Sequence, residues 1–230
     1  MKRVLITLAV VLLTTACGRK ADKNDEPAQL AEIRESALVR FVNAANYKEP
    51  VDVYRDEAKV LPAVGKDKVT DYSEWLAERH EIELRAPANS KPIATKTESL
   101  GAGQRYTVVG FNKLDGSSAV GIFRDNISKP ELGKARIRLI HVADGADDLD
   151  VYPTGSKNAL LSGVDYNTQE VTEINPAISS LEIRKKGEKV VSIKVPSLSL
   201  VAGNTYTIIV ATDAEHKLRA IQIADSVPKA

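Results

Sequence analysis

The apolar residues of the chain form one unbroken run at the N-terminus and a series of shorter runs after it. The first run covers residues 4–13 and contains Thr7 as its only polar member. It is too short for a membrane-spanning helix, which needs roughly 20 apolar residues. Farther along, short apolar stretches alternate with polar ones, and β-branched and aromatic residues are concentrated at 106–111 and 206–211. This pattern predicts a chain built from short β-strands.

Glycine, proline, asparagine and aspartate separate these stretches and mark turns. The expected strands in the first half of the chain are 40–42, 51–54, 80–86, 91–97, 106–111 and 118–124. Those in the second half are 138–140, 149–152, 159–163, 180–185, 188–194, 206–211 and 217–223. Residues 72–79 are the best candidate for a helix, and we expect there a single turn that crosses between sheets.

The two halves of the chain repeat one another. Four pairs of blocks match in the same order at offsets of 98 to 100 residues: 37–43 with 135–141, 51–54 with 149–152, 82–85 with 181–184, and 100–107 with 200–207. We infer an internal duplication, with repeat one at 36–127, a linker at 128–134 and repeat two at 135–230. About seven short strands in about 95 residues predict an all-β fold of two tandem antiparallel β-sandwich domains of the immunoglobulin-like kind.

The blocks at 100–107 and 200–207 share the pattern Leu-x-Ala-Gly-x-x-Tyr-Thr. A tight turn at the glycine would lead into a long central strand, and the tyrosine hydroxyl would bond back to the turn, as in a tyrosine corner. We therefore interpret Tyr106 and Tyr206 as structural residues.

At this point the chain resembles a known family. The blocks at 138–146, 149–152 and 200–207 are similar to the opening and closing blocks of the bacterial domain-of-unknown-function family numbered 4397. The resemblance covers both repeats, and repeat two fits better because repeat one has Asn43 where repeat two has His141. It implies a β-sandwich, an exported protein that is often a lipoprotein, and tandem domains. It supplies no established activity.

The N-terminus has the order of an export signal. Lys2 and Arg3 precede the apolar run, and Thr14-Thr15-Ala16-Cys17 follows it. This end resembles the lipobox of bacterial lipoproteins, although Leu13 lies one residue farther from the cysteine than in the commonest form. The resemblance implies a signal peptide at 1–16 and a diacylglycerol and palmitate anchor on Cys17. A plain secretion signal and an uncleaved anchor are the alternatives.

Cys17 is the single cysteine of the chain, so an internal disulfide framework is excluded. Residues 17–35 are polar and charged and predict a solvated tether. Gly18, in place of aspartate, favours the outer membrane if the cell is Gram-negative; the resemblance does not say which face. Removal of Lys2 and Arg3 changes the formal charge from +1 to −1, so nothing draws the mature chain to nucleic acid.

A catalytic set is hard to assemble from this sequence. A hydrolase needs a nucleophile, a base and an orienting group, and the histidines are only His80, His141 and His216. We expect His80 and His216 to be solvated surface residues. His141 ends a strand, where it would bond the next loop, and Asn43 in the sister repeat can replace a hydrogen bond but not a proton shuttle. We therefore expect no enzyme and no cofactor.

Two further features are candidates for binding. The loop that follows His141 carries four carboxylates, from Asp144, Asp147, Asp148 and Asp150. It lacks EF-hand spacing, so a solvated loop is the first interpretation and a weak calcium site the alternative. Trp75, the single tryptophan, would stack on a sugar if exposed and is otherwise a core residue.

These features favour a membrane-anchored envelope lipoprotein with a binding or structural role and an unknown partner. The partner would be another envelope protein or a polysaccharide. A carbohydrate-binding surface module is the alternative. Binding through Trp75 and neighbouring tyrosines would be favoured by an exposed Trp75 and excluded by a buried one. A hydrolase is the third hypothesis, and it would require two or three of His80, His141, Asp144 and Asp150 to converge in one pocket.

Overall fold

The computed structural model describes residues 35–87, 91–125 and 128–225, and within them every regular element is a β-strand. The first eight strands are β1 Ser36–Asn43, β2 Val51–Arg55, β3 Ala58–Val64, β4 Ser73–Leu76, β5 Arg79–Arg85, β6 Pro92–Ser99, β7 Arg105–Asn112 and β8 Ser118–Arg124. The next eight are β9 Ala135–His141, β10 Leu149–Pro153, β11 Leu161–Val164, β12 Thr168–Ile174, β13 Leu181–Lys185, β14 Ile193–Val195, β15 Thr205–Thr212 and β16 Leu218–Asp225.

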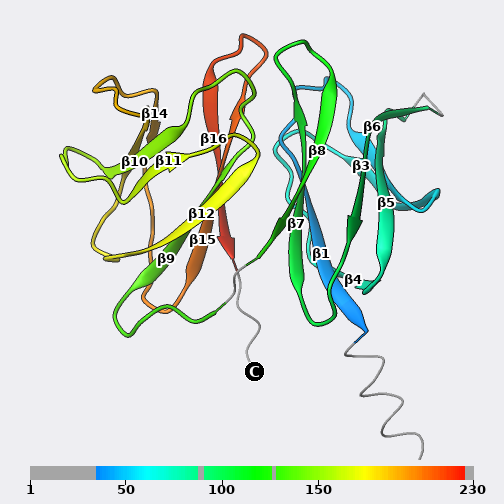
Figure 1. Ribbon diagram of the computed structural model, residues 1–230, viewed down its shortest axis with the longest axis horizontal. Helices are drawn as coiled ribbons and strands as arrows, with labels where there is room; N and C mark the ends of the chain where they lie inside the picture. Colours follow the sequence, from blue (N-terminus) through cyan, green and yellow to red (C-terminus); the bar gives the residue numbers. More distant parts are fainter. Residues whose placement is uncertain (1–34, 88–90, 126–127, 226–230) are drawn as a thin grey trace, which may run out of the picture.

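The strands form four sheets of four strands each, stacked as layers (Figure 1). The outer sheets have the orders β3-β2-β5-β6 and β11-β10-β13-β14, and the inner sheets have the orders β4-β1-β7-β8 and β12-β9-β15-β16. Pairing is antiparallel except between β1 and β7 and between β9 and β15, which are parallel. Each repeat is therefore a sandwich of one outer and one inner sheet, and the prediction of two tandem all-β sandwiches is confirmed.

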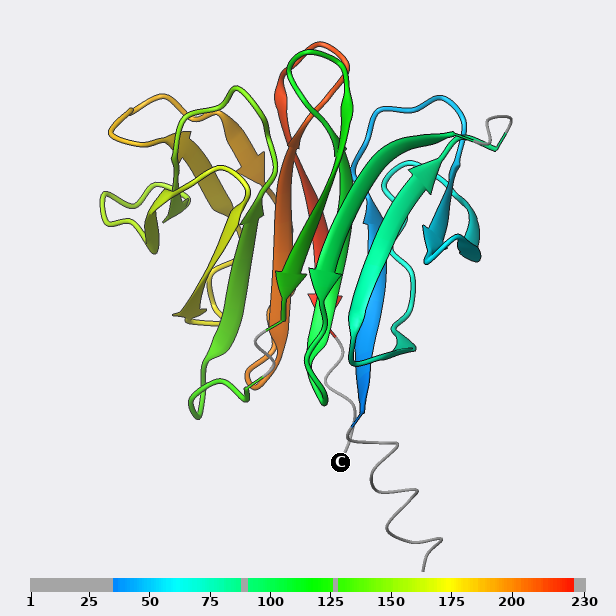
Figure 2. The same ribbon diagram turned by 45° about the vertical axis from the view of Figure 1, so that its right-hand side comes forward.

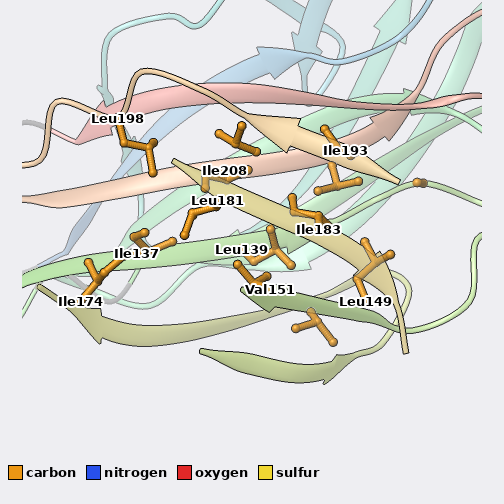
Figure 3. Packing of buried hydrophobic residues seen from close by; sticks show 14 of the residues in the cluster. Ile137, Leu139, Leu149, Val151, Ile174, Leu181, Ile183, Ile193, Leu198 and Ile208 are labelled. Atoms are coloured by element: carbon orange, nitrogen blue, oxygen red, sulfur yellow. The ribbon is translucent and has the colours of Figure 1, made fainter. Parts of the chain in front are cut away.

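Each sandwich has its own core. In repeat two the core lies between β9 and β15 on one side and β10 and β13 on the other, and it consists of branched aliphatic side chains (Figure 3). Ile137, Leu139 and Ile183 are all fully buried there. Repeat one has the equivalent core, into which Phe41 and Trp75 place aromatic rings. Burial of each such side chain stabilises the fold by about 1.5–3 kcal/mol relative to exposure in water.

A third core joins the two inner sheets face to face (Figure 2). Alternate residues of the inner strands point away from their own sandwich, so Val109 of β7 and Ile209 of β15 meet in this core rather than water. Strands buried on both faces have near-continuous apolar sequences, which explains the runs at 106–111 and 206–211. The two repeats therefore share a buried interface as well as having separate cores.

The tyrosine corners are present. The backbone N–H of Gly101 donates to the Tyr106 hydroxyl at 2.9 Å, and that of Val201 donates to the Tyr206 hydroxyl at 2.9 Å. The Tyr206 hydroxyl itself donates to the carbonyl of Ser199 at 3.1 Å. Both tyrosines therefore fasten the turn that precedes a central strand, as the repeated block predicts.

The prediction of a helical turn at 72–79 is wrong. Residues Ser73–Leu76 form β4, an inner-sheet strand that pairs with β1 and places the indole of Trp75 opposite Ala37. Tertiary pairing overrides the local helix propensity, because Trp75 fills the core only from an extended chain. In the expected strand at 188–194, residues 188–192 are irregular, and β14 is confined to Ile193–Val195. The strands β3, β4 and β12 were not expected at all.

The export signal, Cys17 and nearly all of the proposed tether lie outside the described residues. Within the described part of the chain, no helix is long and apolar enough to cross a membrane. The described chain begins at Glu35, whose carbonyl accepts a hydrogen bond from Ala77 beside the start of β1.

Candidate functional site

Two buried ion pairs, each with one residue from either repeat, join the repeats. We call these pairs, Arg40 with Asp225 and Arg138 with Asp125, the lock. Arg40 of β1 forms an ion pair with Asp225 at the end of β16, with 2.6 Å between the Nη2 and Oδ1 atoms. Reciprocally, Arg138 of β9 pairs with Asp125, which follows β8. The side chains of Arg138 and Asp125 are 2% and 3% exposed, so this second pair is fully removed from solvent.

Threonines connect the two ion pairs. The Arg40 Nε atom donates to Thr107 at 2.9 Å, and the Arg138 Nε atom donates to Thr207 at 2.9 Å. Thr107 in turn donates to Asp125, and Thr207 donates to Asp225. The arrangement of arginine, threonine and aspartate is similar in the two repeats, so the repeats are related by an approximate two-fold arrangement. Only Arg138 also donates to the threonine of the other repeat, Thr107. A charge that is both paired and hydrogen-bonded in this way can remain buried.

The hairpin tips break this symmetry. The β7–β8 hairpin carries Leu114, which packs against Gly145 so tightly that a Cβ atom on that glycine would lie 2.9 Å from the leucine Cδ2. The N–H of Leu114 also donates to Asp144 at 2.9 Å. In the opposite pairing, the β15–β16 hairpin has Ala214 at the position of Leu114, and repeat one has Tyr47 at the position of Gly145. One of the two equivalent contacts is therefore closed by a leucine and the other is not.

A groove of about 360 Å³ occupies the open side, between the two hairpin tips and the loop after β1. We call it the inter-repeat groove. Its lining residues are Asn46, Tyr47, Asn112, Lys113, Gly116, Thr212, Asp213, Ala214 and His216. They come from both repeats, so the lock that fixes the repeats also fixes the shape of the groove.

Asn46 supplies a free acceptor in this groove. Its backbone N–H donates to Asn112 at 2.6 Å, and its side-chain Nδ2 atom donates to the carbonyl of Thr212 at 2.9 Å. Its Oδ1 atom is buried and has no hydrogen-bond partner among the described residues. A buried polar atom of this kind is uncommon in folded proteins and is normally satisfied by water or a ligand. Beside it, burial raises the pKa of Tyr47 to about 12, so the phenol is neutral at physiological pH.

His216 has an unusual backbone conformation at the rim of the groove. Its φ angle is 59°, in the left-handed region, and the sister hairpin has Gly116 there with a φ angle of 81°. Glycine takes this conformation without steric cost, whereas a side chain with a Cβ atom is uncommon there. The hairpins otherwise match in their backbone hydrogen bonds. The N–H of Lys113 donates to Ser117 and its carbonyl accepts from Gly116, and Asp213 makes the same two bonds with Lys217 and His216. The turn therefore does not require a histidine at position 216, and this residue differs from its counterpart in the other repeat.

Of the residues singled out from the sequence, Trp75 is buried, at 4% exposure. Its indole contacts the His80 ring edge to face, at 5.7 Å between centroids, and the Arg55 guanidinium lies over it. A side chain this buried cannot serve as a stacking platform, so the stacking role proposed for Trp75 is wrong.

The expectation that His80 is solvated is also wrong. The residue is 1% exposed, and its Nδ1 and Nε2 atoms lie 2.6 Å from Asp56 and 2.9 Å from the carbonyl of Leu76. It anchors the β4–β5 turn against the core. His216 is exposed, as expected.

His141 has the structural contacts that its position predicts. The ring is fully buried, its Nδ1 atom accepts from the N–H of Ala143 at 3.3 Å, and its Nε2 atom faces the carbonyl of Asp147 at 3.3 Å. Asn43 makes the equivalent bond to the N–H of Ala45 at 3.1 Å. Burial lowers the pKa of His141 below its ordinary value. In both repeats this residue fastens the loop that follows the first strand.

The acidic loop does not gather its carboxylates. Asp147 and Asp148 pair with neighbouring lysines, at 3.3 Å and 2.9 Å respectively. Asp144 accepts from the hairpin of the other repeat, as described above. Asp150 is 4% exposed and accepts from the N–H of Gly163 at 2.8 Å, as Asp52 accepts from Ala63 in repeat one. Asp150 therefore stabilises the irregular pairing of β10 with β11.

The candidate catalytic residues have separate partners. His80 bonds Asp56 in repeat one, whereas His141, Asp144 and Asp150 each bond a different backbone group. Within residues 35–87, 91–125 and 128–225, no group of three or more histidine, cysteine, aspartate or glutamate side chains is placed to hold a metal ion.

The profile of the family described as domain of unknown function, DUF4397, matches residues 37–152. The chain belongs to this family. The match runs from the first residues of β1 through all of repeat one and on to Tyr152 in β10, so it ends after the opening blocks of repeat two. No curated protein matches the DUF4397 chain.

Several solved structures are weakly similar to the chain. A family 26 carbohydrate-binding module from Eubacterium rectale, solved with maltoheptaose, has 9% identity and a TM-score of 0.27, covering 84% of this chain and 98% of that one. A streptococcal virulence factor that binds α-glucan has 16% identity and a TM-score of 0.25, covering 79% and 95%. A putative cell adhesion protein from Bacteroides uniformis has 10% identity and a TM-score of 0.27, covering 84% and 99%. Likeness at this level does not extend to a ligand.

Sequence reasoning did not identify the inter-repeat groove. Its distinguishing residues in the DUF4397 chain are Tyr47, Ala214 and His216, which stand opposite Gly145, Leu114 and Gly116 in the sister repeat. A comparison of the loops between repeats, in addition to the matching blocks, would have shown these three differences. That they meet in one place required the structure.

Proposed function

We propose that the DUF4397 chain is a lipid-anchored cell-envelope protein that binds a ligand in the inter-repeat groove and has no catalytic role. The observation that carries the binding role is the broken symmetry of the hairpin tips. Where one contact is closed by Leu114 on Gly145, the other keeps a polar groove of about 360 Å³ with an unsatisfied acceptor. Binding sites are typically concave and have a few convergent polar groups.

The chemistry of the groove fits a neutral ligand rich in hydroxyl groups. Lys113 and Asp213 contribute opposite charges, and the remaining polar lining consists of amide, hydroxyl and imidazole groups. Asn46 Oδ1 is an acceptor for which a ligand hydroxyl would be the donor. An envelope polysaccharide has such groups, so the carbohydrate-binding alternative is retained on this groove rather than on Trp75.

The anchor is tested first. Cys17→Ser removes the thiol on which the lipid would be attached, so we expect the protein to leave the membrane fraction and to lose metabolic labelling with palmitate. Sucrose-gradient fractionation of a Gram-negative host would then show whether the wild-type protein sits in the outer membrane, as Gly18 favours. A Cys17→Ser protein that stays labelled and membrane-bound would contradict the anchor.

The groove is tested separately by filling it. Ala214→Leu copies the sister hairpin and places a larger apolar side chain in the groove, while Ala58→Leu makes the same change on exposed β3. Saturation-transfer NMR with soluble envelope oligosaccharides should show contact for the wild type and Ala58→Leu but not for Ala214→Leu. Equal transfer to all three proteins would place binding outside the groove. No transfer to any of them would exclude carbohydrate as the ligand.

A photo-crosslinking amino acid at His216 identifies a ligand of any other class in cells. The proposed binding role predicts adducts at His216 that Ala214→Leu abolishes and that a crosslinker at Ala58 does not form. Absence of adducts at His216 would contradict a binding role for the groove.

A further inference from the structure

Exposed apolar side chains gather at one end of the double sandwich. Leu132 in the linker, Val201 before β15 and Leu76 at the end of β4 are 104%, 57% and 59% exposed. Leu132 and Val201 lie at turns, whereas Leu76 is the last residue of β4. Single exposed apolar side chains are ordinary, but three at one end of the molecule indicate a surface that contacts something apolar.

Backbone contacts place these residues at the same end. Leu76 pairs with Ser36 at the start of β1, and the N–H of Gly203, two residues after Val201, donates to the carbonyl of Lys134. The N–H of Lys134 donates to Glu131, which closes the turn that carries Leu132. Both views show the starts of β1, β9 and β15 at this end and the tips of the β7–β8 and β15–β16 hairpins at the other (Figures 1 and 2). These hairpin tips line the groove. We call it the anchor pole.

The chain enters the structure at the anchor pole. Glu35, the first described residue, is bonded to Ala77, the neighbour of Leu76. Seventeen residues separate it from Cys17. The solvated tether predicted from their composition would have an end-to-end distance of about 20–25 Å, which would let the pole reach the bilayer surface without carrying it far away. Such a tether holds the pole near the lipid at an effective concentration in the millimolar range, so weak contacts suffice.

We propose that the anchor pole rests on the membrane, with Leu76, Leu132 and Val201 inserted at the level of the lipid headgroups. The proposal rests on the proposed anchoring through Cys17. Exposed Lys129 and Lys134 flank Leu132 and would face anionic headgroups, with Glu131 between them. This orientation directs the inter-repeat groove away from the membrane.

The test uses the mature lipoprotein reconstituted into vesicles of phosphatidylethanolamine and phosphatidylglycerol. Acylated Cys17 does not react with maleimides, so Leu132→Cys and Val201→Cys each provide one site for an environment-sensitive fluorophore. Leu114→Cys is the matched control, because Leu114 is also an exposed leucine, at 55%, but lies on a hairpin tip. Binding of the fluorophore to lipid by itself would affect all three positions alike.

We expect blue-shifted emission and quenching by headgroup spin-labelled lipid at positions 132 and 201, with neither change at 114. If the protein floats with the vesicles but the emission at 132 and 201 matches that at 114, the anchor pole proposal is wrong and the anchoring stands. If the protein does not float with the vesicles and carries no acyl label, both proposals are overturned.

Discussion

The buried pair of Arg138 and Asp125 offers the sharpest test of how the repeats are joined. Arg138→Met keeps much of the side-chain volume but removes the charge, and it leaves a carboxylate that is 3% exposed without its cation. Breaking a buried ion pair from one side costs about 3–5 kcal/mol. Hydrogen bonds from Arg138 to Thr107 and Thr207 are lost at the same time. We therefore expect the free energy of unfolding to fall by about 3–5 kcal/mol.

A double-mutant cycle separates the pair from its surroundings. Asp125→Asn alone leaves the arginine buried without a counter-charge, whereas the double variant Arg138→Met with Asp125→Asn removes both charges of this pair. We expect the double variant to be more stable than the sum of the single effects predicts, by up to about 3 kcal/mol. The exposed pair of Lys186 and Asp148, at 57% and 34% exposure, is the control, and its removal should cost at most about 1 kcal/mol.

Urea denaturation followed by two signals measures both the cost and the coupling. Trp75 is the single tryptophan and lies in the core of repeat one, so its fluorescence reports that repeat, while circular dichroism reports both. The two transitions should coincide in the wild type and separate in Arg138→Met, because two-state behaviour requires an intact interface. If Arg138→Met lowered the free energy of unfolding by less than about 1 kcal/mol, and if the effects of the two single substitutions were additive, the pair would not be what joins the repeats.

Three further outcomes follow from the cores and loops. Because burial lowers the pKa of His141 below 6.5, the unfolded chain takes up the proton first, so this contribution to stability is complete above about pH 6.5 and declines as the pH falls. His141→Asn, which copies Asn43, should therefore show a smaller fall in Tm between about pH 7.5 and pH 5; an equal fall would contradict the role of burial. Tyr106→Phe and Tyr206→Phe should each cost about 1–3 kcal/mol in denaturant titrations, since a turn N–H loses its acceptor, and unchanged midpoints would contradict the tyrosine corners. Trp75→Ala should cost about 3–5 kcal/mol without changing oligosaccharide binding, and lost binding in a folded variant would reverse the assignment of Trp75 to the core.

Much of the fold could be read from the repeated blocks, because they coincide with the strands that form the cores. The blocks around Arg40 and Arg138 are β1 and β9, and those around Tyr106 and Tyr206 begin β7 and β15. What could not be read was the burial of both faces of these strands. Arg40 lies at 4% exposure although its residue type is normally solvated, and only its partner in the other repeat explains this.

The candidate site was harder to predict, because chemistry was sought in rare residue types. His80, His141 and Trp75 all proved to be core or loop-fastening residues. The inter-repeat groove instead depends on Ala214, a residue with no chemistry of its own, whose small side chain leaves space that a leucine fills in the sister contact. A small side chain such as that of Ala214 forms no recognisable sequence motif. The space that it leaves is visible only when the two repeats are compared in the structure.

The reciprocal lock also explains how the two hairpin tips came to differ. The ion pairs and the apolar contacts between the inner sheets hold the repeats in place through residues that both copies retain, such as Arg40 and Arg138. With the association secured there, the contact of Leu114 on Gly145 is not needed twice, and one copy can open without separating the repeats. A duplicated domain thereby has a groove that neither copy has alone. Such a groove should tolerate substitutions at Ala214 without loss of the fold, whereas substitutions in the lock should not be tolerated.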